Sequence, residues 1–377
     1  MLQIDHVYEF LYQNLFKDFA LAHLFNGVVK TGQNINIDTD ISIFTSSSNA
    51  DKKIFFYDQE PLIPQLAQPY VEIFNSIPGR KILVTSENSA VFDQIAQDNN
   101  YSKLYYFFHG FAAIDWYRGF YALNYNKQVV KPYKYGFISM NRIIANDRSY
   151  RIYFISLLKA QGLLDHGLVS FNVTDNAFDD WCDEVADPNS KLTEQAKQHV
   201  ETHLVNIDRL VIDNYQLPGS ASADIPRGND ALWNIVTETV FYYNKLHLTE
   251  KIFKPIVSKQ PFMLVAAPGN LAYLRSYGFK TFDGIIDESY DLIQDNDQRT
   301  AAVVDQLAWY CGLSEDEKLD VIKRIEPIVL HNFHHFYGEF RHIITQELIT
   351  NAKTLFKDLG YDDSHINYND IYHVLTH

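Results

Sequence analysis

The chain has 377 residues, of which 46% are hydrophobic, and a formal net charge of −15. It is long enough for two cores of ordinary size, so two domains are expected. The negative charge argues against a broad surface for nucleic acid or for an anionic membrane, although it leaves room for a small basic pocket. Two cysteines, Cys182 and Cys311, are too few for a disulfide framework. Without a signal-like amino terminus or an apolar run of about 18 residues, the protein is expected to be cytoplasmic, with no membrane span.

The first part of the chain has the pattern of a small α/β domain. Apolar residues recur with a helical period over residues 1–30, which predicts a helix there. Three short apolar segments follow at 53–57, 81–85 and 103–108. Their length and composition predict three strands, and the first two are separated by segments that suit helices.

A polar cluster follows each of these three predicted strands. The first cluster contains Asp58 and Glu60, and the third begins with His109. Parallel strands bring their carboxyl ends to one edge of a sheet, so these clusters indicate a binding site. A carboxylate that is partly desolvated has a raised pKa and can take a proton from an attacking hydroxyl. In the alternative interpretation Asp58 caps a helix, Glu60 is solvated and His109 is structural.

A linker rich in Lys, Val, Pro and Tyr at 128–133 precedes a second α/β set. Its first predicted strand covers 135–140, and its second covers 167–173. Between them we expect a helix with Asp147 as N-cap and Gly162 as the stop.

Three arginines, Arg142, Arg148 and Arg151, fall at the end of the first of these strands and in the first turn of the helix. A basic cluster at this position in an acidic protein favours an anion site. At least one of the three is expected to be an ordinary surface residue. The polar, acidic stretch 174–230 that follows is interpreted as an excursion from the domain.

The alternation of predicted strands and helices is clearest at 231–278. It predicts a strand at 232–236, a helix that opens at Thr249, a second strand at 262–266, a Pro-Gly turn and another short helix. This is a β-α-β-α unit, whose ligands bind beyond the carboxyl ends of the strands near helix amino termini.

Three adjacent residues at the start of the predicted helix carry the chemistry. Thr249 suits an N-cap, and Glu250 suits the positive end of the helix dipole. Lys251 opposes that dipole by roughly 0.3–1 kcal/mol, which makes sense where an anion binds. A phosphate would use the lysine and the backbone N–H groups, and Glu250 would accept from a sugar hydroxyl. The alternative is a solvated Glu-Lys pair on an amphipathic helix.

The remaining sequence predicts one more strand with an acidic turn at 278–291, followed by helices broken at Pro327. Four histidines fall between 331 and 342. Because aromatic residues alternate with them and no HExxH motif occurs, the segment favours a packed helix over a metal site.

Several motifs occur in a fixed order: a strand ending in Asn-Arg at 141–142, a helix with more arginines, Glu-Thr at 238–239, LTEKI at 248–252, and a strand followed by Pro-Gly. This order resembles the donor half of GT-B glycosyltransferases, closest to the fucosyltransferase family with a Tyr-Val-Thr-Glu-Lys-Leu type motif. The chain also resembles uncharacterised, largely phage-associated proteins with YDQEPL, FFHG and LTEK segments. The likeness covers most of 53–300.

This resemblance implies two Rossmann-like domains that face a central cleft, and a helical C-terminal tail. Residues 1–130 would form the acceptor-side domain, and 131–330 the nucleotide-sugar donor domain. The helices of 331–377 would pack back across the cleft.

Site roles follow from the same resemblance. Glu250 would bind the ribose of the nucleotide, Lys251 would bind the diphosphate, and Arg142, Arg148 or Arg151 would offset the charge of the leaving group. Glu238 and Thr249 are also expected to bind the donor. The family's Phe-Glu-Asn-Ser segment is replaced here by Val-Thr-Glu-Thr at 236–239, which is a departure from the family. A first-domain carboxylate would act as base, a role that Glu60 resembles loosely. His247 replaces the family's tyrosine, which leaves the donor sugar open.

The sequence therefore predicts a metal-independent glycosyltransferase that uses a nucleotide sugar, of hexosyl, pentosyl or fucosyl type, and needs no cofactor. Its acceptor would be a glycan or a hydroxymethylated base of phage DNA, and a phage-encoded protein would act in the host cytoplasm. Two alternatives stay open: a non-catalytic nucleotide- or sugar-binding protein with the same fold, and a phosphorylase.

Overall fold

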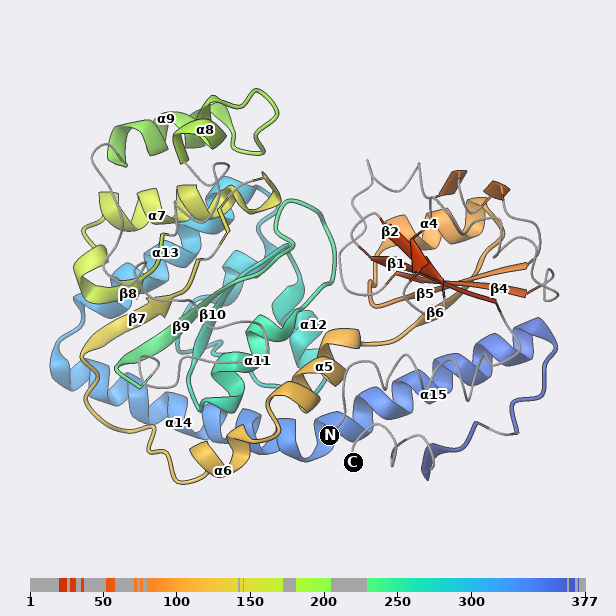
Figure 1. The fold of residues 1–377 in the computed structure, drawn as a ribbon. Helices are drawn as coiled ribbons and strands as arrows, with labels where there is room; N and C mark the ends of the chain where they lie inside the picture. The colour runs from red at the N-terminus through yellow and green to blue at the C-terminus, as the bar shows by residue number, and fades with distance from the viewer. Residues whose placement is uncertain are drawn as a thin grey trace. The chain divides into compact units, whose positions relative to one another are not determined.

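The chain divides into two compact units, each described here by itself (Figure 1). Unit 1 comprises Met1–Asp115 with Gly338–His377, and unit 2 comprises Trp116–Tyr337. These bounds differ from the domain boundaries expected at 130 and 330. The structure is a computed structural model. It describes residues 20–25, 28–31, 35–36, 52–57, 71–72, 75–76, 80–141, 143–144, 146–171, 181–204, 229–364, 366–369 and 372.

Unit 1 contains a six-stranded sheet in the order β3-β2-β1-β4-β5-β6. Its strands are β1 (Ala20–Phe25), β2 (Val28–Thr31), β3 (Ile35–Asn36), β4 (Lys52–Tyr57), β5 (Arg80–Thr85) and β6 (Ser102–Tyr105). Strands β1, β4, β5 and β6 run parallel, and β1, β2 and β3 pair antiparallel. The three predicted strands of this part are confirmed as parallel neighbours, and their carboxyl ends meet at one edge.

The predicted helix over 1–30 was wrong for 20–25 and 28–31, which form β1 and β2. Residues 1–19 lie outside the described part. β1 pairs with β2 on one side and with β4 on the other. A short apolar run is compatible with both the helical period and the strand period. Here the backbone pairing with β4, which is distant in the sequence, makes the segment a strand.

Helices as well as strands belong to the described part of unit 1. The side chain of Ser89 caps α4 (Ala90–Asp98) by accepting from the Phe92 N–H at 3.3 Å. α15 (Glu339–Leu359) packs against β6, where Asn351 donates to the Tyr105 carbonyl at 3.0 Å. The predicted strand 103–108 ends early, because α5 (Phe108–Trp116) begins at Phe108.

Unit 2 is built on a four-stranded parallel sheet in the order β10-β9-β7-β8. Its strands are β7 (Tyr135–Ser139), β8 (Gly167–Val169), β9 (Ala231–Thr237) and β10 (Phe262–Val265). β9 and β10 are apolar along almost their whole length, as in a sheet that is covered on both faces. Trp233 of β9 is among the largest fully buried side chains.

Helices cover both sides of this sheet, with α7 and α13 on one side and α11 and α14 on the other (Figure 1). In the described residues, the helices and 3-10 turns of unit 2 are α6 (Phe120–Asn124), η2 (Asn146–Arg148), α7 (Tyr150–Ala160), η3 (Leu164–His166), α8 (Trp181–Ala186), α9 (Glu194–His203), α11 (Glu250–Val257), α12 (Asn270–Ser276), η5 (Glu288–Leu292), α13 (Asn296–Gly312) and α14 (Glu315–Tyr337). The predicted β-α-β-α unit is confirmed as β9-α11-β10-α12, and the mixed α/β class is confirmed for the chain.

Three local predictions in unit 2 were wrong. Pro327 lies inside α14, whose buried stripe offsets the roughly 3 kcal/mol that an interior proline costs. Residues 278–291 form turns, one isolated bridge between Asp283 and Ile286, and the start of η5. Asp147 lies in η2 before the N-cap Ser149, and its carboxylate accepts from the Tyr243 hydroxyl at 3.2 Å.

Candidate functional site

Polar side chains close the carboxyl edge of the unit 2 sheet. Asn141, which follows β7, is buried; its N–H donates to Ser170 Oγ at 2.6 Å. The hydroxyl of Thr237, at the end of β9, donates to Asn141 Oδ1 at 3.1 Å. This buried network joins the ends of three neighbouring strands, so it fixes the loops that leave them.

Glu238, the residue after β9, is fully buried. Its Oε1 accepts from the backbone N–H of Thr249 at 3.1 Å, and its Oε2 accepts from the Thr249 hydroxyl at 2.5 Å. Burial raises the pKa of Glu238, and the nearby Lys251 opposes that shift. The carboxylate therefore connects the end of β9 to the start of α11, and both of its oxygens are engaged within the protein.

Thr249 is confirmed as the N-cap of α11. Its backbone is extended, and Oγ1 accepts from the Lys251 N–H at 3.4 Å. The same hydroxyl donates to Glu238, so one side chain ends the helix and joins it to the sheet.

The ammonium group of Lys251 lies over the amino end of α11. Its Nζ donates to Thr239 Oγ1 at 3.1 Å, to Thr249 Oγ1 at 3.2 Å and to Glu250 Oε1 at 3.2 Å. The Lys251 side chain is 31% exposed. The cation therefore bends back onto the positive end of the helix dipole, where it is unfavourable in the absence of negative charge.

Glu250 supplies part of that negative charge and is buried. The Tyr117 hydroxyl donates to its backbone carbonyl at 3.4 Å, and burial holds the pKa of Tyr117 well above its usual value. One turn further along, burial lowers the pKa of Lys254 to about 8, although Glu250 opposes the shift. Two lysines and one glutamate thus share the first turns of α11.

The amino end of α12 is arranged differently. Both carboxylate oxygens of Asp291 accept from the Leu271 N–H, at 3.2 and 3.1 Å. A protein carboxylate already fills that position. Of the two helices in the β9-α11-β10-α12 unit, α11 is therefore the one whose amino end carries a cation.

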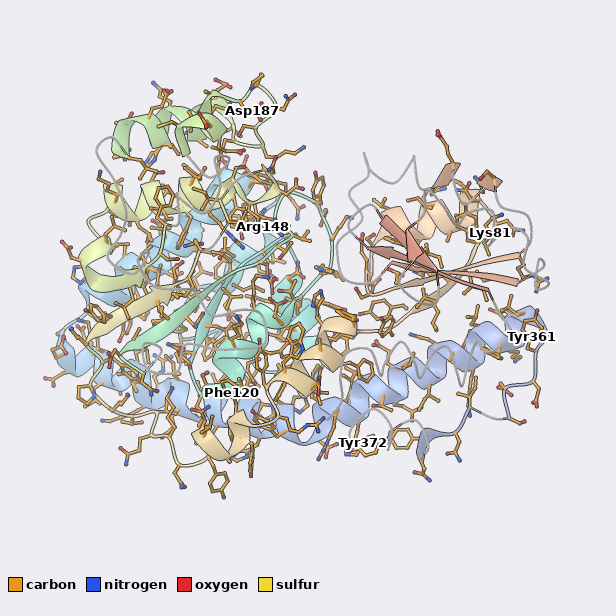
Figure 2. All side chains as sticks on the ribbon, in the orientation of Figure 1. Lys81, Phe120, Arg148, Asp187, Tyr361 and Tyr372 are labelled. Atoms are coloured by element: carbon orange, nitrogen blue, oxygen red, sulfur yellow. The ribbon has the colours of Figure 1, made fainter. Side chains whose placement is uncertain are left out.

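The three arginines predicted to form one cluster have different environments. Arg142 lies outside the described residues, and Arg148 lies half-buried in η2 (Figure 2). Arg151 is buried in α7, and its guanidinium donates to the carbonyls of Ile143 and Thr237, each at 2.7 Å. Arg151 therefore has a structural role between α7 and the two loops, which explains its burial without a bound anion.

The candidates from the first part of the chain belong to unit 1. Asp58 and Glu60 lie outside the described residues. His109 lies in the first turn of α5 and not at a strand end; it is buried, with its ring 5.2 Å from that of Phe108. The reason is that β6 stops at Tyr105.

Glu87 is a buried carboxylate in the second of the three predicted polar clusters, to which the sequence analysis assigned no role of its own. It follows β5, its N–H donates to Thr85 Oγ1 at 2.9 Å, and its Oε1 accepts from the Ser89 hydroxyl at 2.7 Å. Its position at a strand end, two residues before an N-cap serine, is a signal that could have identified it.

The histidines of α14 form part of its packing. Nε2 of His331 lies 3.0 Å from the Gly278 carbonyl, and Nε2 of His335 lies 2.7 Å from the Tyr277 carbonyl. Both hold the turn after α12. Within the described part of the chain, no group of three or more His, Cys, Asp or Glu residues is placed to hold a metal ion.

No helix in the described ranges is long and apolar enough to cross a membrane. Comparison of the chain with protein-family models, with curated proteins and with solved structures finds no match.

Proposed function

We propose that the protein is a metal-independent glycosyltransferase that moves a sugar from a nucleotide-sugar donor to an acceptor hydroxyl. The observation that carries this proposal is the ammonium of Lys251 over the amino end of α11, beside the carboxyl end of β9. The order of motifs along the chain, which resembles GT-B glycosyltransferases, supports the same function.

The environment of Lys251 suits a diphosphate. A helix amino terminus offers N–H groups and a positive dipole, and the lysine adds a full charge. Its three donor hydrogens now bind two threonine hydroxyls and Glu250. A phosphate oxygen would replace one of these acceptors with little movement of the side chain, and would gain a charge-assisted hydrogen bond.

The charge at this position acts on the bond that breaks. When the bond between the sugar carbon and the diphosphate oxygen breaks, the electron pair leaves with the diphosphate. A fixed cation then stabilises the transition state more than the bound donor. The acceptor oxygen forms the new bond to the sugar carbon, and its proton passes to a base. The predicted candidates for this base are Asp58, Glu60 and His109.

The roles proposed within unit 2 follow from burial. Lys251 and Arg148 would contact the diphosphate, and Glu250 would accept from a sugar or ribose hydroxyl. Glu238 and Thr249 would hold α11 in place and not contact the donor, because they bind each other. The acceptor proposed is a glycan or a hydroxymethylated base of phage DNA, in the cytoplasm of the cell or host.

The test is release of nucleoside diphosphate from a panel of nucleotide sugars, each paired with glycan and hydroxymethylated-DNA acceptors. We expect one donor to give release above hydrolysis, and the same donor to raise the melting temperature by mass action. A raised melting temperature without release would replace the proposal with a non-catalytic binding protein. If no donor gives either release or a raised melting temperature, both the glycosyltransferase and the binding-protein proposals are wrong.

A further inference from the structure

The 3-10 turn η2, which carries Arg148, is held by side chains from two other parts of unit 2. Its first residue, Asn146, has a φ of 56°, in the left-handed region that favours glycine. A residue in this conformation stays there where the surrounding contacts hold it. The Asn146 N–H donates to Glu184 Oε2 of α8 at 2.9 Å. A side chain distant in the sequence therefore fixes the start of the turn.

Glu184 is a buried carboxylate. Its other oxygen, Oε1, accepts from the Ser190 hydroxyl at 3.0 Å. Burial raises the pKa of Glu184, and its hydrogen bonds with Asn146 and Ser190 oppose the shift. Burying a carboxylate is costly unless its oxygens are hydrogen-bonded. Here one of the two oxygens binds a single backbone N–H of η2.

The segment that supplies Glu184 is itself attached to the rest of unit 2. α8 packs against α9, and α9 lies alongside α7 (Figure 1). Ser156 Oγ of α7 and His199 Nδ1 of α9 lie 3.0 Å apart. The hydroxyl of Thr193, the N-cap of α9, donates to Asp297 of α13. Glu184 therefore holds η2 from a supported position.

The loop after β9 holds the other side of η2. The Tyr243 hydroxyl donates to Asp147 Oδ1 at 3.2 Å, and the Tyr242 hydroxyl lies 2.7 Å from Ser149 Oγ. Together with the Glu184 contact, these bonds fix residues 146, 147 and 149. The backbone is therefore held on both sides of Arg148.

Arg148 lies within electrostatic reach of the end of β9. Burial raises the pKa of Tyr150; the charge of Glu238 adds to this shift, and the charge of Arg148 opposes it. The Tyr150 hydroxyl donates to the Glu238 carbonyl at 2.5 Å. Glu238 in turn binds Thr249 at the amino end of α11. The held turn thus carries a cation beside the candidate donor site.

We propose that Glu184 is a positioning residue, which holds the Asn146 N–H and thereby fixes η2 so that the Arg148 guanidinium meets the diphosphate of the donor. This inference rests on the proposed function. A cation on a fixed backbone loses less conformational freedom when it binds an anion, so its contact contributes more to affinity. If Glu184 only stabilised α8, its effect on affinity would not depend on Arg148.

Hydrogen exchange of the free protein, followed by mass spectrometry on peptides that contain Asn146, tests the contact itself. Glu184→Ala removes the acceptor, so the Asn146 amide should exchange faster. Glu184→Gln should keep exchange slow, because its amide oxygen can accept from Asn146 while its NH2 group donates to Ser190 Oγ. The control Glu201→Gln, at an exposed glutamate of α9, should exchange as the wild type. Unchanged exchange in Glu184→Ala overturns the proposal.

Calorimetric titration with nucleoside diphosphates tests whether the effect passes through Arg148. Glu184→Ala should weaken the affinity about tenfold, and Glu184→Gln should weaken it less than about threefold. In an Arg148→Ala background, Glu184→Ala should have no further effect, because the contact that it supports is already absent. Equal weakening in both backgrounds, or no weakening in either, overturns the inference and leaves the proposed function in place. A wild type that binds no diphosphate removes the proposed function, and the inference with it.

Thermal melts of every variant separate lost positioning from lost folding. If Glu184→Ala does not fold, Tyr243→Phe takes its place, because it removes the hydrogen bond to Asp147 and keeps the ring. Tyr243→Phe should weaken diphosphate affinity in the wild-type background and leave it unchanged in the Arg148→Ala background. The same loss of affinity in both backgrounds, or none in either, overturns the proposal.

Discussion

Both carboxylate oxygens of Glu238 accept hydrogen bonds from Thr249, across the gap between the end of β9 and the start of α11, and Oε2 also accepts from the Thr239 N–H at 3.3 Å. Thr249 in turn caps the helix and accepts from Lys251 Nζ at 3.2 Å. A fully buried carboxylate thus sets the position of the cation on which the proposed function depends.

Replacing Glu238 with glutamine should destabilise the fold. In either orientation the amide NH2 would face a backbone N–H, that of Thr249 or that of Thr239, and a buried donor without an acceptor costs about 1–3 kcal/mol. Urea unfolding of Glu238→Gln measures the change in the free energy of unfolding. Asp320→Asn, at an exposed carboxylate of α14, is the matched control and should change it by less than about 0.5 kcal/mol. Equal stability of the two variants would show that the Glu238–Thr249 contact contributes nothing.

Stability should also depend on pH through Glu238. Burial raises its pKa in the folded protein above the ordinary 4.5. A carboxyl group with a raised folded pKa contributes stability below the unfolded pKa, and that contribution is lost as pH rises through the folded value. The wild type should therefore lose more stability than Glu238→Gln between pH 4.5 and the raised value. Unfolding curves of both proteins across this range provide the measurement, and parallel pH profiles would contradict the prediction.

Substitutions of Arg151 and of Arg148 should differ in whether they mainly affect stability or donor binding. Arg151→Lys should lower the free energy of unfolding by about 2–3 kcal/mol, because one ammonium cannot replace a guanidinium that binds the Ile143 and Thr237 carbonyls together. Arg148→Ala should weaken donor binding and should lower stability less than Arg151→Lys does. Chemical unfolding and nucleotide titration on both variants test this, and the reverse pattern would assign the donor contact to Arg151.

Lys251→Ala should lower turnover by about 10²–10³-fold, as expected for removal of one group that stabilises transition-state charge. Its stability should also fall, because Glu250, whose side chain is only 8% exposed, would lose its cationic partner. Steady-state rates with the best donor measure the effect. Lys323→Ala, on the exposed side of α14, serves as the control and should keep full turnover.

The sequence predicted the parts of the fold where local pattern and tertiary structure agree. Strands β4, β5, β7, β9 and β10 are short apolar runs between polar ends, which the period identifies. The N-cap at Thr249 was also predictable, because it depends on the chemistry of one residue beside a helix start.

The failures arose where distant contacts decide the outcome. β1 and β2 became strands through pairing, and α14 continues through Pro327 because of its buried stripe. The residues of the candidate site show the same contrast between local signals and distant contacts. Lys251 was selected because its charge conflicts with a local rule, whereas the inward-facing roles of Glu238 and Arg151 depend on the partners that the fold brings to them.

The most direct test of the central claim is calorimetric titration of the wild type and of Lys251→Ala with a panel of nucleoside diphosphates. We predict that one diphosphate binds the wild type, and that the substitution weakens its affinity by at least tenfold at a temperature at which thermal melts show both proteins to be folded. Equal affinities for the two proteins would contradict the claim that this lysine binds a diphosphate.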